Sequence, residues 1–333
     1  MKENGKDSLL SVIIPCYNEE EGIGLTIQTL TNTMEKANIP YELVLVSDGS
    51  KDRTFEIIQK FFEEDPEHIR GIAFSRNFGK ESAMLAGMRY ARGDCAVVID
   101  SDLQHPPEAI PQMYQLYLNG YDIVEGVKKE RQKESLIHRI FASMFYAVFN
   151  RAIGMNVKNT SDFKLISRRV INVLLQMPEH ERFFRGLTFW TGFSMTTLPY
   201  EVQPRRAGES KWSFRKLIHY AMQNIISFSA APLRFITIIG GIMLLMSFLF
   251  AVRALRLYFS GLAAGGATTI VMLILMTGGL ILVALSIIGL YIAGIYNEIK
   301  ARPSYLVDRT VGVDQPGVEE HIDKKEKQQG GVS

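Results

Sequence analysis

Short apolar runs alternate with amphipathic stretches over the N-terminal half of the chain. The apolar runs are Leu10–Pro15, Tyr41–Ser47, Ile69–Phe74, Cys95–Ile99 and Asp122–Glu125. Apolar residues recur at helical spacing between them, in Glu20–Lys36, Arg53–Glu64, Lys80–Ala91 and Pro107–Asn119. Strands that alternate with helices in this way predict an α/β domain, in which a mostly parallel sheet is covered by helices.

The last third of the chain contains two long apolar segments. Phe235–Val252 and Leu257–Asn297 contain no charged residue. A helix of about 20 residues crosses the bilayer core of roughly 30 Å. We therefore expect two transmembrane helices, at about 235–257 and 268–296. The alternative is a buried helical hairpin in a soluble protein, and glycines within both segments favour membrane packing instead.

Charged residues around these segments predict their orientation. Basic residues on the outer flanks are Arg215, Lys216, Arg234, Lys300, Arg302 and Arg309, and those near the connection are Arg253 and Arg256. The positive-inside rule then places the domain and both termini in the cytosol. Residues 1–10 are polar and do not resemble a signal peptide. We expect a multi-pass protein of the cell (plasma) membrane.

The same pattern divides the chain into segments. We expect a flexible N-terminus at 1–8, a cytosolic domain at 9–212 and an amphipathic interfacial helix at 213–231. The transmembrane pair follows at 232–300, and 301–333 is a mostly disordered cytosolic tail, polar from Asp308 onward. Residues 138–153 also have one apolar and one basic face, so they form either a second interfacial helix or an ordinary core helix.

Composition narrows the function classes. The net charge of +2, from 37 basic and 35 acidic residues, does not suggest a protein that coats nucleic acid, and we expect no nucleic-acid partner. The two cysteines, Cys16 and Cys95, have neither zinc-site spacing nor the number needed for a disulfide framework. We interpret both as buried thiols.

Polar residues follow four of the predicted strands. The segments after them begin at Tyr17, Asp48, Ser75 and Asp100. The carboxyl ends of parallel strands meet at one edge, where α/β sheets bind ligands. Each polar group alone could cap a helix or shape a turn. Asp100-Ser101-Asp102 nevertheless predicts a divalent-cation site, with Gln104 as a further oxygen ligand.

Four motifs together resemble glycosyltransferase family 2. They are Val12–Glu19, Ser47–Asp52, Arg76–Lys80 and Asp100–Glu108. Within the family they are similar to the polyprenyl-phosphate glycosyltransferases, which include dolichol-phosphate mannosyltransferase and its bacterial undecaprenyl-phosphate relatives. The resemblance covers about residues 8–305. It implies a GT-A fold, a nucleotide-sugar donor, Mg²⁺ or Mn²⁺, and a polyprenyl-phosphate acceptor.

The resemblance also assigns roles to individual residues. Those implied for nucleotide binding are Pro15, Tyr17, Asn18, Glu19, Asp48, Asn77 and Lys80. Those implied for the metal are Asp100, Asp102 and Gln104, and the catalytic pair is Asp102 and Asp162. Those implied for the lipid phosphate are Arg182, Arg185, Arg205, Arg206, Ser210 and Lys211. Cationic donors shortly before a membrane helix independently suit a lipid phosphate. His105 is interpreted as shaping the turn after the metal motif.

The expected reaction is a direct displacement at the anomeric carbon, which inverts its configuration. A bound cation would stabilise the leaving diphosphate. Because the second pKa of a phosphate monoester is about 6, the acceptor needs no general base, and Asp162 either acts as that base or orients a substrate. UDP-glucose and UDP-N-acetylglucosamine are the leading donors, followed by GDP-mannose. The product would be a lipid-phosphate sugar for cell-envelope glycosylation.

Three other functions remain open. A processive polysaccharide synthase would share these motifs, but its QxxRW segment is missing from the sequence. Transfer to another membrane lipid, such as diacylglycerol, fits the same topology, and so does a non-catalytic membrane scaffold. The resemblance further implies a homotetramer, and two spans per chain suggest a separate flippase and a downstream glycosyltransferase as partners.

Overall fold

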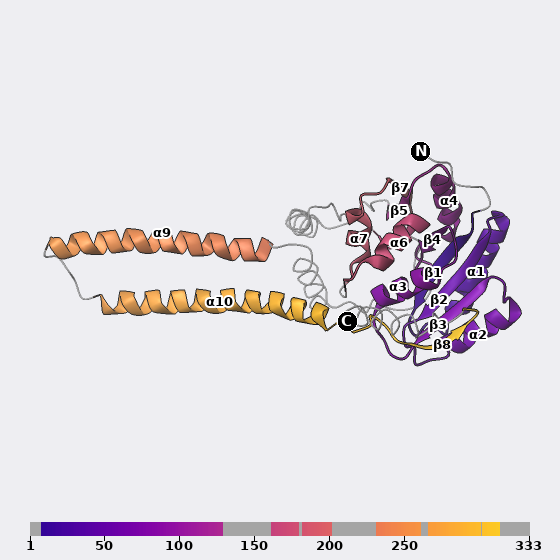
Figure 1. The fold of residues 1–333 in the computed structure, drawn as a ribbon, viewed down its shortest axis with the longest axis horizontal. Helices are drawn as coiled ribbons and strands as arrows, with labels where there is room; N and C mark the ends of the chain where they lie inside the picture. The colour runs from indigo at the N-terminus through magenta and orange to yellow at the C-terminus, as the bar shows by residue number, and fades with distance from the viewer. Residues whose placement is uncertain are drawn as a thin grey trace, which may run out of the picture.

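The computed structural model describes residues 8–128, 161–179, 182–201, 231–260, 266–300 and 302–313. One mixed sheet organises the N-terminal domain, with strand order β7-β5-β6-β4-β1-β2-β3-β8 (Figure 1). The first five strands are β1 (Leu10–Cys16), β2 (Tyr41–Ser47), β3 (Ile69–Phe74), β4 (Cys95–Val98) and β5 (Ile123–Lys128). The others are β6 (Lys164–Ser167), β7 (Met195–Tyr200) and β8 (Val307–Val311).

The centre of this sheet is parallel. β1 pairs in parallel with β2 and β4, and β2 pairs in parallel with β3. β6 runs antiparallel to both β4 and β5, whereas β7 is parallel to β5. The predicted mostly parallel α/β sheet is therefore confirmed, and the carboxyl ends of four adjacent strands form one rim.

Helices cover both faces of the sheet. The helices after the first four strands are α1 (Ile23–Lys36), α2 (Thr54–Glu64), α3 (Lys80–Tyr90) and α4 (Ile110–Leu118), the last preceded by the 3₁₀ turn η1 (Pro107–Ala109). The later ones are α6 (Arg168–Gln176) and α7 (Phe184–Trp190). Side chains of α1, α2 and α4 pack with Val12 and Ile14 on one face, whereas those of α3, α6 and α7 pack with Ile13 on the other. Successive residues of β1 thus serve opposite cores, as the strand period of two requires.

Two short strands were not predicted from the sequence. β6 has four residues, and β7 alternates exposed and half-buried residues and contains Pro199. Neither contains the long apolar run that marks a buried central strand. β7 is held instead by its parallel pairing with β5, from Ile123–Met195 to Lys128–Tyr200.

The chain returns to the sheet after its apolar helices. β8 pairs antiparallel with β3, and the ring of nearby Tyr305 stacks on Phe74 with centroids 4.9 Å apart. The expectation that the chain is disordered from Asp308 onward is therefore wrong for Asp308–Val311. Polar residues suit this strand because it lies at the sheet edge, where only one side is paired.

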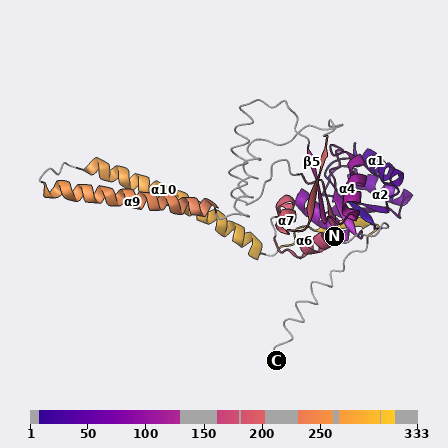
Figure 2. The same cartoon turned by 90° about the horizontal axis from the view of Figure 1, so that it is seen from above.

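The apolar segments form two long helices, α9 (Ala231–Phe259) and α10 (Ala267–Ile299). Figures 1 and 2 show them side by side, projecting away from the sheet domain. By length and composition, one segment among the described residues could cross a membrane, Met276–Tyr296, with a mean hydropathy of 2.3. The apolar part of α9, Ile236–Phe250, is shorter. The predicted interfacial helices at 138–153 and 213–231 lie outside the described residues, apart from Ala231 at the start of α9.

Candidate active site

The loops that follow β1 and β2 are joined at the rim. The Asn18 side-chain oxygen accepts a hydrogen bond from the Lys51 N–H at 2.9 Å, and the Asn18 N–H donates to Ser50 Oγ at 3.1 Å. Asn18 has a positive φ of 54°, a conformation that asparagine tolerates better than most residues. Next to it, the Tyr17 side chain is 42% exposed and accessible to a ligand.

Asp48 fixes the next pair of loops. Its carboxylate is buried and accepts hydrogen bonds from the N–H groups of Phe78 (2.7 Å) and Gly79 (2.9 Å), where α3 begins. Burial raises the pKa of Asp48, and these two hydrogen bonds oppose the shift. Asp48, predicted to touch the nucleotide, thus has both oxygens engaged by the protein backbone, beneath the rim.

The predicted metal motif lies at the end of β4. Leu103 turns the chain with a positive φ of 52°, and Asp102 Oδ1 accepts a hydrogen bond from the Gln104 N–H at 3.1 Å. The backbone carbonyl of Ser101 accepts a hydrogen bond from the Thr26 hydroxyl of α1 at 2.7 Å. The backbone of the motif is therefore held by a hydrogen bond within the turn and by a second one from α1.

These residues fit a hard divalent cation. Asp100, Asp102 and Gln104 offer only oxygen ligands, the type that Mg²⁺ and Mn²⁺ prefer. Over the described part of the chain, no group of three or more His, Cys, Asp or Glu side chains is arranged to hold a metal. A cation held by the two carboxylates and the Gln104 amide oxygen would keep further coordination positions for the oxygens of a substrate.

A charged cluster links the metal motif to Asp162. The Lys80 ammonium lies 2.6 Å from Asp100 Oδ1 and 3.0 Å from Asp162 Oδ2. Arg185 at the start of α7 holds Asp162 through two hydrogen bonds, from Nε at 2.7 Å and from a terminal nitrogen at 3.0 Å. Burial opposes ionisation of both carboxyls. Lys80 and His105 outweigh this effect at Asp100, and Lys80 and Arg185 outweigh it at Asp162, so the pKa of each carboxyl lies well below the ordinary range.

His105 contacts the metal motif, which the sequence interpretation did not anticipate. Its Nε2 lies 3.5 Å from Asp100 Oδ2, its Nδ1 lies 2.8 Å from the Tyr200 hydroxyl, and its ring stacks on Phe163. His105 is buried, so it forms a wall of the site rather than a solvent-exposed turn. Its position ties β7 to the end of β4.

A buried ion pair lies next to the segment that contains Asp162. Lys164 on β6 lies 2.9 Å from Glu125 of β5 and donates to the Thr188 hydroxyl of α7 at 3.2 Å. Burial lowers the pKa of Lys164, and Glu125 partly restores it. Since this pair joins three elements around Asp162, its role is to position that segment.

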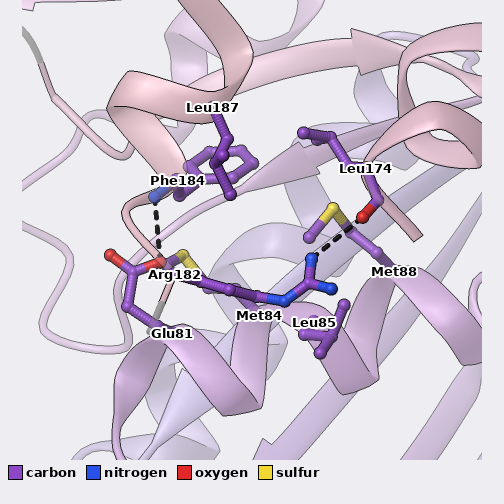
Figure 3. Close-up of a pocket in the computed structure, with 8 residues that line it drawn as sticks. All are labelled: Glu81, Met84, Leu85, Met88, Leu174, Arg182, Phe184 and Leu187. Carbon is purple, nitrogen blue, oxygen red and sulfur yellow. Dashed lines mark hydrogen bonds between the residues drawn. The ribbon is translucent and has the colours of Figure 1, made fainter. Parts of the chain in front are cut away.

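Arg182 lies apart from the charged cluster. Its guanidinium donates to the backbone carbonyls of Leu174 and Met177 at the end of α6 (Figure 3). The side chain lines a cavity between α3, α6 and α7, with several methionine and leucine side chains. The described contacts thus give Arg182 a structural role, and its predicted role in phosphate binding is not supported by them.

Glu81 connects that cavity to the cluster. Its carboxylate accepts a hydrogen bond from the Phe184 N–H at 3.1 Å, at the first residue of α7 (Figure 3). Burial raises the pKa of Glu81 to about 8, with the nearby Asp162 adding to the effect. α3 and α7 are therefore joined directly by Glu81 and Phe184, and indirectly through Asp162, which both Lys80 and Arg185 contact.

The structure brings several predicted site residues together. Those gathered around one rim position are Lys80, Asp100, Asp102, Gln104, Asp162 and Arg185. Tyr17, Asn18, Glu19 and Asn77 occupy neighbouring rim loops, and Pro15 is buried near the end of β1. The remaining predicted phosphate ligands, Arg205, Arg206, Ser210 and Lys211, lie outside the described residues.

A mostly parallel sheet with an Asp-x-Asp motif at its carboxyl rim defines the GT-A class of nucleotide-sugar-binding domains. Residues 11–172 match the family model for glycosyl transferase family 2. An uncharacterized glycosyltransferase of Synechocystis is 38% identical over 92% of this chain and 96% of its own length. The chain belongs to glycosyltransferase family 2.

Two other relatives have more specific names. The undecaprenyl-phosphate 4-deoxy-4-formamido-L-arabinose transferase of Proteus mirabilis is 33% identical over 96% of this chain and 98% of its own. The prophage bactoprenol glucosyl transferase homolog of Escherichia coli K12 is 34% identical over 90% and 98%. Each likeness extends beyond the sheet domain into the apolar helices.

Among solved structures, glucosyl-3-phosphoglycerate synthase of Mycobacterium tuberculosis, in complex with Mg²⁺ and UDP, matches with a TM-score of 0.49 and 19% identity. The match covers 66% of this chain and 77% of that one.

Proposed function

We propose that this enzyme transfers a sugar from a nucleotide sugar to undecaprenyl or another polyprenyl phosphate, with inversion at the anomeric carbon. The observation that carries the proposal is the Lys80–Asp162–Arg185 cluster beside the Asp100–Asp102 motif. A donor diphosphate at the motif and an acceptor phosphate at the cluster would then face each other. The names of two relatives, an undecaprenyl-phosphate transferase and a bactoprenol glucosyl transferase, support this acceptor class.

Asp102, Asp100 and Gln104 are the residues that would hold the cation. When bound, Mg²⁺ or Mn²⁺ supplies charge stabilisation for the leaving diphosphate. The chain's own cations, Lys80 and Arg185, lie where a second anionic group can approach. An arginine recognises phosphate through two parallel hydrogen bonds, so Arg185 is suited to an acceptor phosphate.

Asp162 orients the acceptor side rather than removing a proton. Lys80 and Arg185 overcome the effect of burial and lower its pKa, which makes its carboxylate a weak base. The acceptor phosphate is largely dianionic at neutral pH and needs no base. Asp162 therefore holds Arg185 and Lys80 in place until the substrates arrive.

The donor we favour is UDP-glucose or UDP-N-acetylglucosamine, and the glucosyl transferase name of one relative supports the first. Radiolabelled donors, including GDP-mannose, are offered with undecaprenyl phosphate in detergent, with and without Mg²⁺ or Mn²⁺. We expect one donor to give a metal-dependent lipid-phosphate sugar that Asp102→Ala does not make. Label in diacylglycerol instead would identify another lipid acceptor, and no product with any donor would favour the scaffold.

We further propose that α9 and α10 cross the plasma membrane as a pair, with the sheet domain and the tail in the cytosol. The pairing of β8 with β3 supports this, because the chain leaves the domain before α9 and rejoins it after α10. Two membrane crossings return the chain to the side of the sheet domain, whereas a single crossing would leave β8 on the opposite side from β3.

Cysteine labelling in intact cells tests this topology. The native Cys16 and Cys95 are buried, so they give a low background. We expect a membrane-impermeant maleimide to label Ser260→Cys, at the end of α9, and to label Asp308→Cys only after permeabilisation. Equal labelling of the two variants in intact cells would contradict the two-span topology.

A further inference from the structure

We propose that the Lys80 ammonium and the divalent cation compete for Asp100, so that binding of the cation releases Lys80 towards the acceptor side. The inference rests on the metal site in the proposed function and assigns Lys80 a role beyond contact with the nucleotide. It makes Lys80 a residue that couples the two halves of the active site.

The geometry places Lys80 between two carboxylates that belong to different halves. Asp100 Oδ1 lies 2.6 Å from the ammonium on the metal side, and Asp162 Oδ2 lies 3.0 Å away on the other side. Lys80 is the first residue of α3, so its backbone is fixed while its long side chain can turn. A small rotation of this side chain would move the ammonium away from Asp100 while it keeps its contact with Asp162.

Electrostatics make simultaneous occupation of Asp100 unfavourable. A Mg²⁺ or Mn²⁺ ligand oxygen lies roughly 2.0–2.2 Å from the metal. A cation bound to Asp100 would therefore be a close neighbour of an ammonium 2.6 Å from the same carboxylate. Like charges at such separations repel each other even at the effective dielectric constant of about 20 found near protein surfaces. The cation and Lys80 therefore weaken each other's hold on Asp100.

The second carboxylate gives the released lysine a destination. Asp162 already shares the ammonium, and Arg185 continues the positive surface beyond it. Lys80 released from Asp100 can thus add its charge to the place where the second substrate's phosphate would lie. Loading the metal site would thereby prepare the acceptor site.

Mn²⁺ binding to the full-length protein in detergent, without nucleotide, tests the competition directly. Free Mn²⁺ is measured by its electron paramagnetic resonance signal. We expect Lys80→Ala and Lys80→Met to bind Mn²⁺ about tenfold more tightly than the wild type, because a repelling charge is lost. Lys80→Arg keeps the charge and should bind Mn²⁺ as the wild type does.

Two further variants separate the possible outcomes. Lys36→Ala removes an exposed lysine from the last residue of α1, the end of the helix that lies away from the carboxyl rim, and should leave Mn²⁺ affinity unchanged. If Lys80→Ala and Lys80→Met both bind Mn²⁺ no more tightly than the wild type, the competition is overturned while the proposed function stays intact. If the wild type binds no Mn²⁺, or if Asp102→Ala binds it equally well, the proposed metal site is wrong, and the competition is wrong with it.

Discussion

Arg182 and Arg185 are three positions apart in the sequence and make different kinds of contact. Arg182 binds the carbonyls that end α6, whereas Arg185 binds Asp162 in the charged cluster. We expect Arg182→Ala to lower the free energy of unfolding by about 2–3 kcal/mol, because hydrogen bonds from a charged donor are lost. Arg185→Ala should instead reduce kcat/KM about a hundredfold, with little change in stability. Thermal unfolding and transfer kinetics of both variants check the contrast, and loss of acceptor binding in Arg182→Ala alone would reverse the assignment.

The buried carboxyl of Glu81 should make stability depend on pH. The pKa of this carboxyl is about 8 in the folded protein and near its ordinary value of 4.5 in the unfolded chain. Between these values the folded state holds a proton that the unfolded state has released, so stability falls as pH rises towards 8. Glu81→Gln removes that titration. We therefore expect its Tm, relative to the wild type, to rise between pH 5 and pH 8 by roughly 2–4 °C for each kcal/mol involved.

This dependence is measured by thermal unfolding in detergent at several pH values. Glu81→Gln keeps an oxygen that can accept from the Phe184 N–H, so the contact to α7 survives in the variant. A Tm difference that is the same at every pH would show that burial does not perturb Glu81.

The sequence located the candidate site residues at the ends of the strands, but it did not predict the side chains that contact them. Asp100, Asp102 and Asp162 stand in motifs with distinct spacing. The contact of His105 with Tyr200 joins positions 95 residues apart, and that of Glu81 with Phe184 joins positions 103 apart. No local pattern encodes such pairs, because they depend on how the strands order themselves in the sheet.

At the scale of elements, the loop after β2 packs tightly against the loop after β3. Gly49 has a φ of 65°, and a Cβ there would lie 2.1 Å from the backbone carbonyl carbon of Arg76. We expect Gly49→Ala to destabilise the protein by more than about 3 kcal/mol and to abolish nucleotide binding, since strain and overlap add. Folded yield and UDP binding are the measurements.

Gly192 provides the matched control. Its φ of 66° is nearly the same, but no atom lies within 4 Å of the position of a Cβ. Gly192→Ala should therefore cost only about 1–2 kcal/mol, the strain of the backbone conformation alone. Equal effects of the two substitutions would mean that the close approach of the loops is unimportant.

The elements themselves were predictable where their pattern was long. The first four strands and their helices fall within a residue or a few of the sequence-based bounds, because buried parallel strands are continuous apolar runs. β6, β7 and β8 are short or lie near an edge, and their stability comes from pairing with distant strands. A pattern within one segment does not contain that partner.

At the scale of the whole molecule, the C-terminal segment should be part of the folded domain. β8 covers the edge of β3, and Tyr305, Val307 and Val313 pack against the core. We expect removal of 303–333 to lower the Tm of the sheet domain by several degrees, whereas removal of 314–333 should leave it unchanged. Thermal unfolding of the two truncated proteins decides this, and equal Tm values would mean that β8 adds nothing.

The place of β8 in the chain also sets an order of events during synthesis. The ribosome makes β3 long before β8, and both apolar helices are made in between. The nascent domain therefore has an open β3 edge while the helices are being inserted, and unpaired edges are sites of aggregation. Maturation of the catalytic domain therefore requires that β8 has emerged from the ribosome, and translation that stops before β8 would release a domain with an unpaired β3 edge.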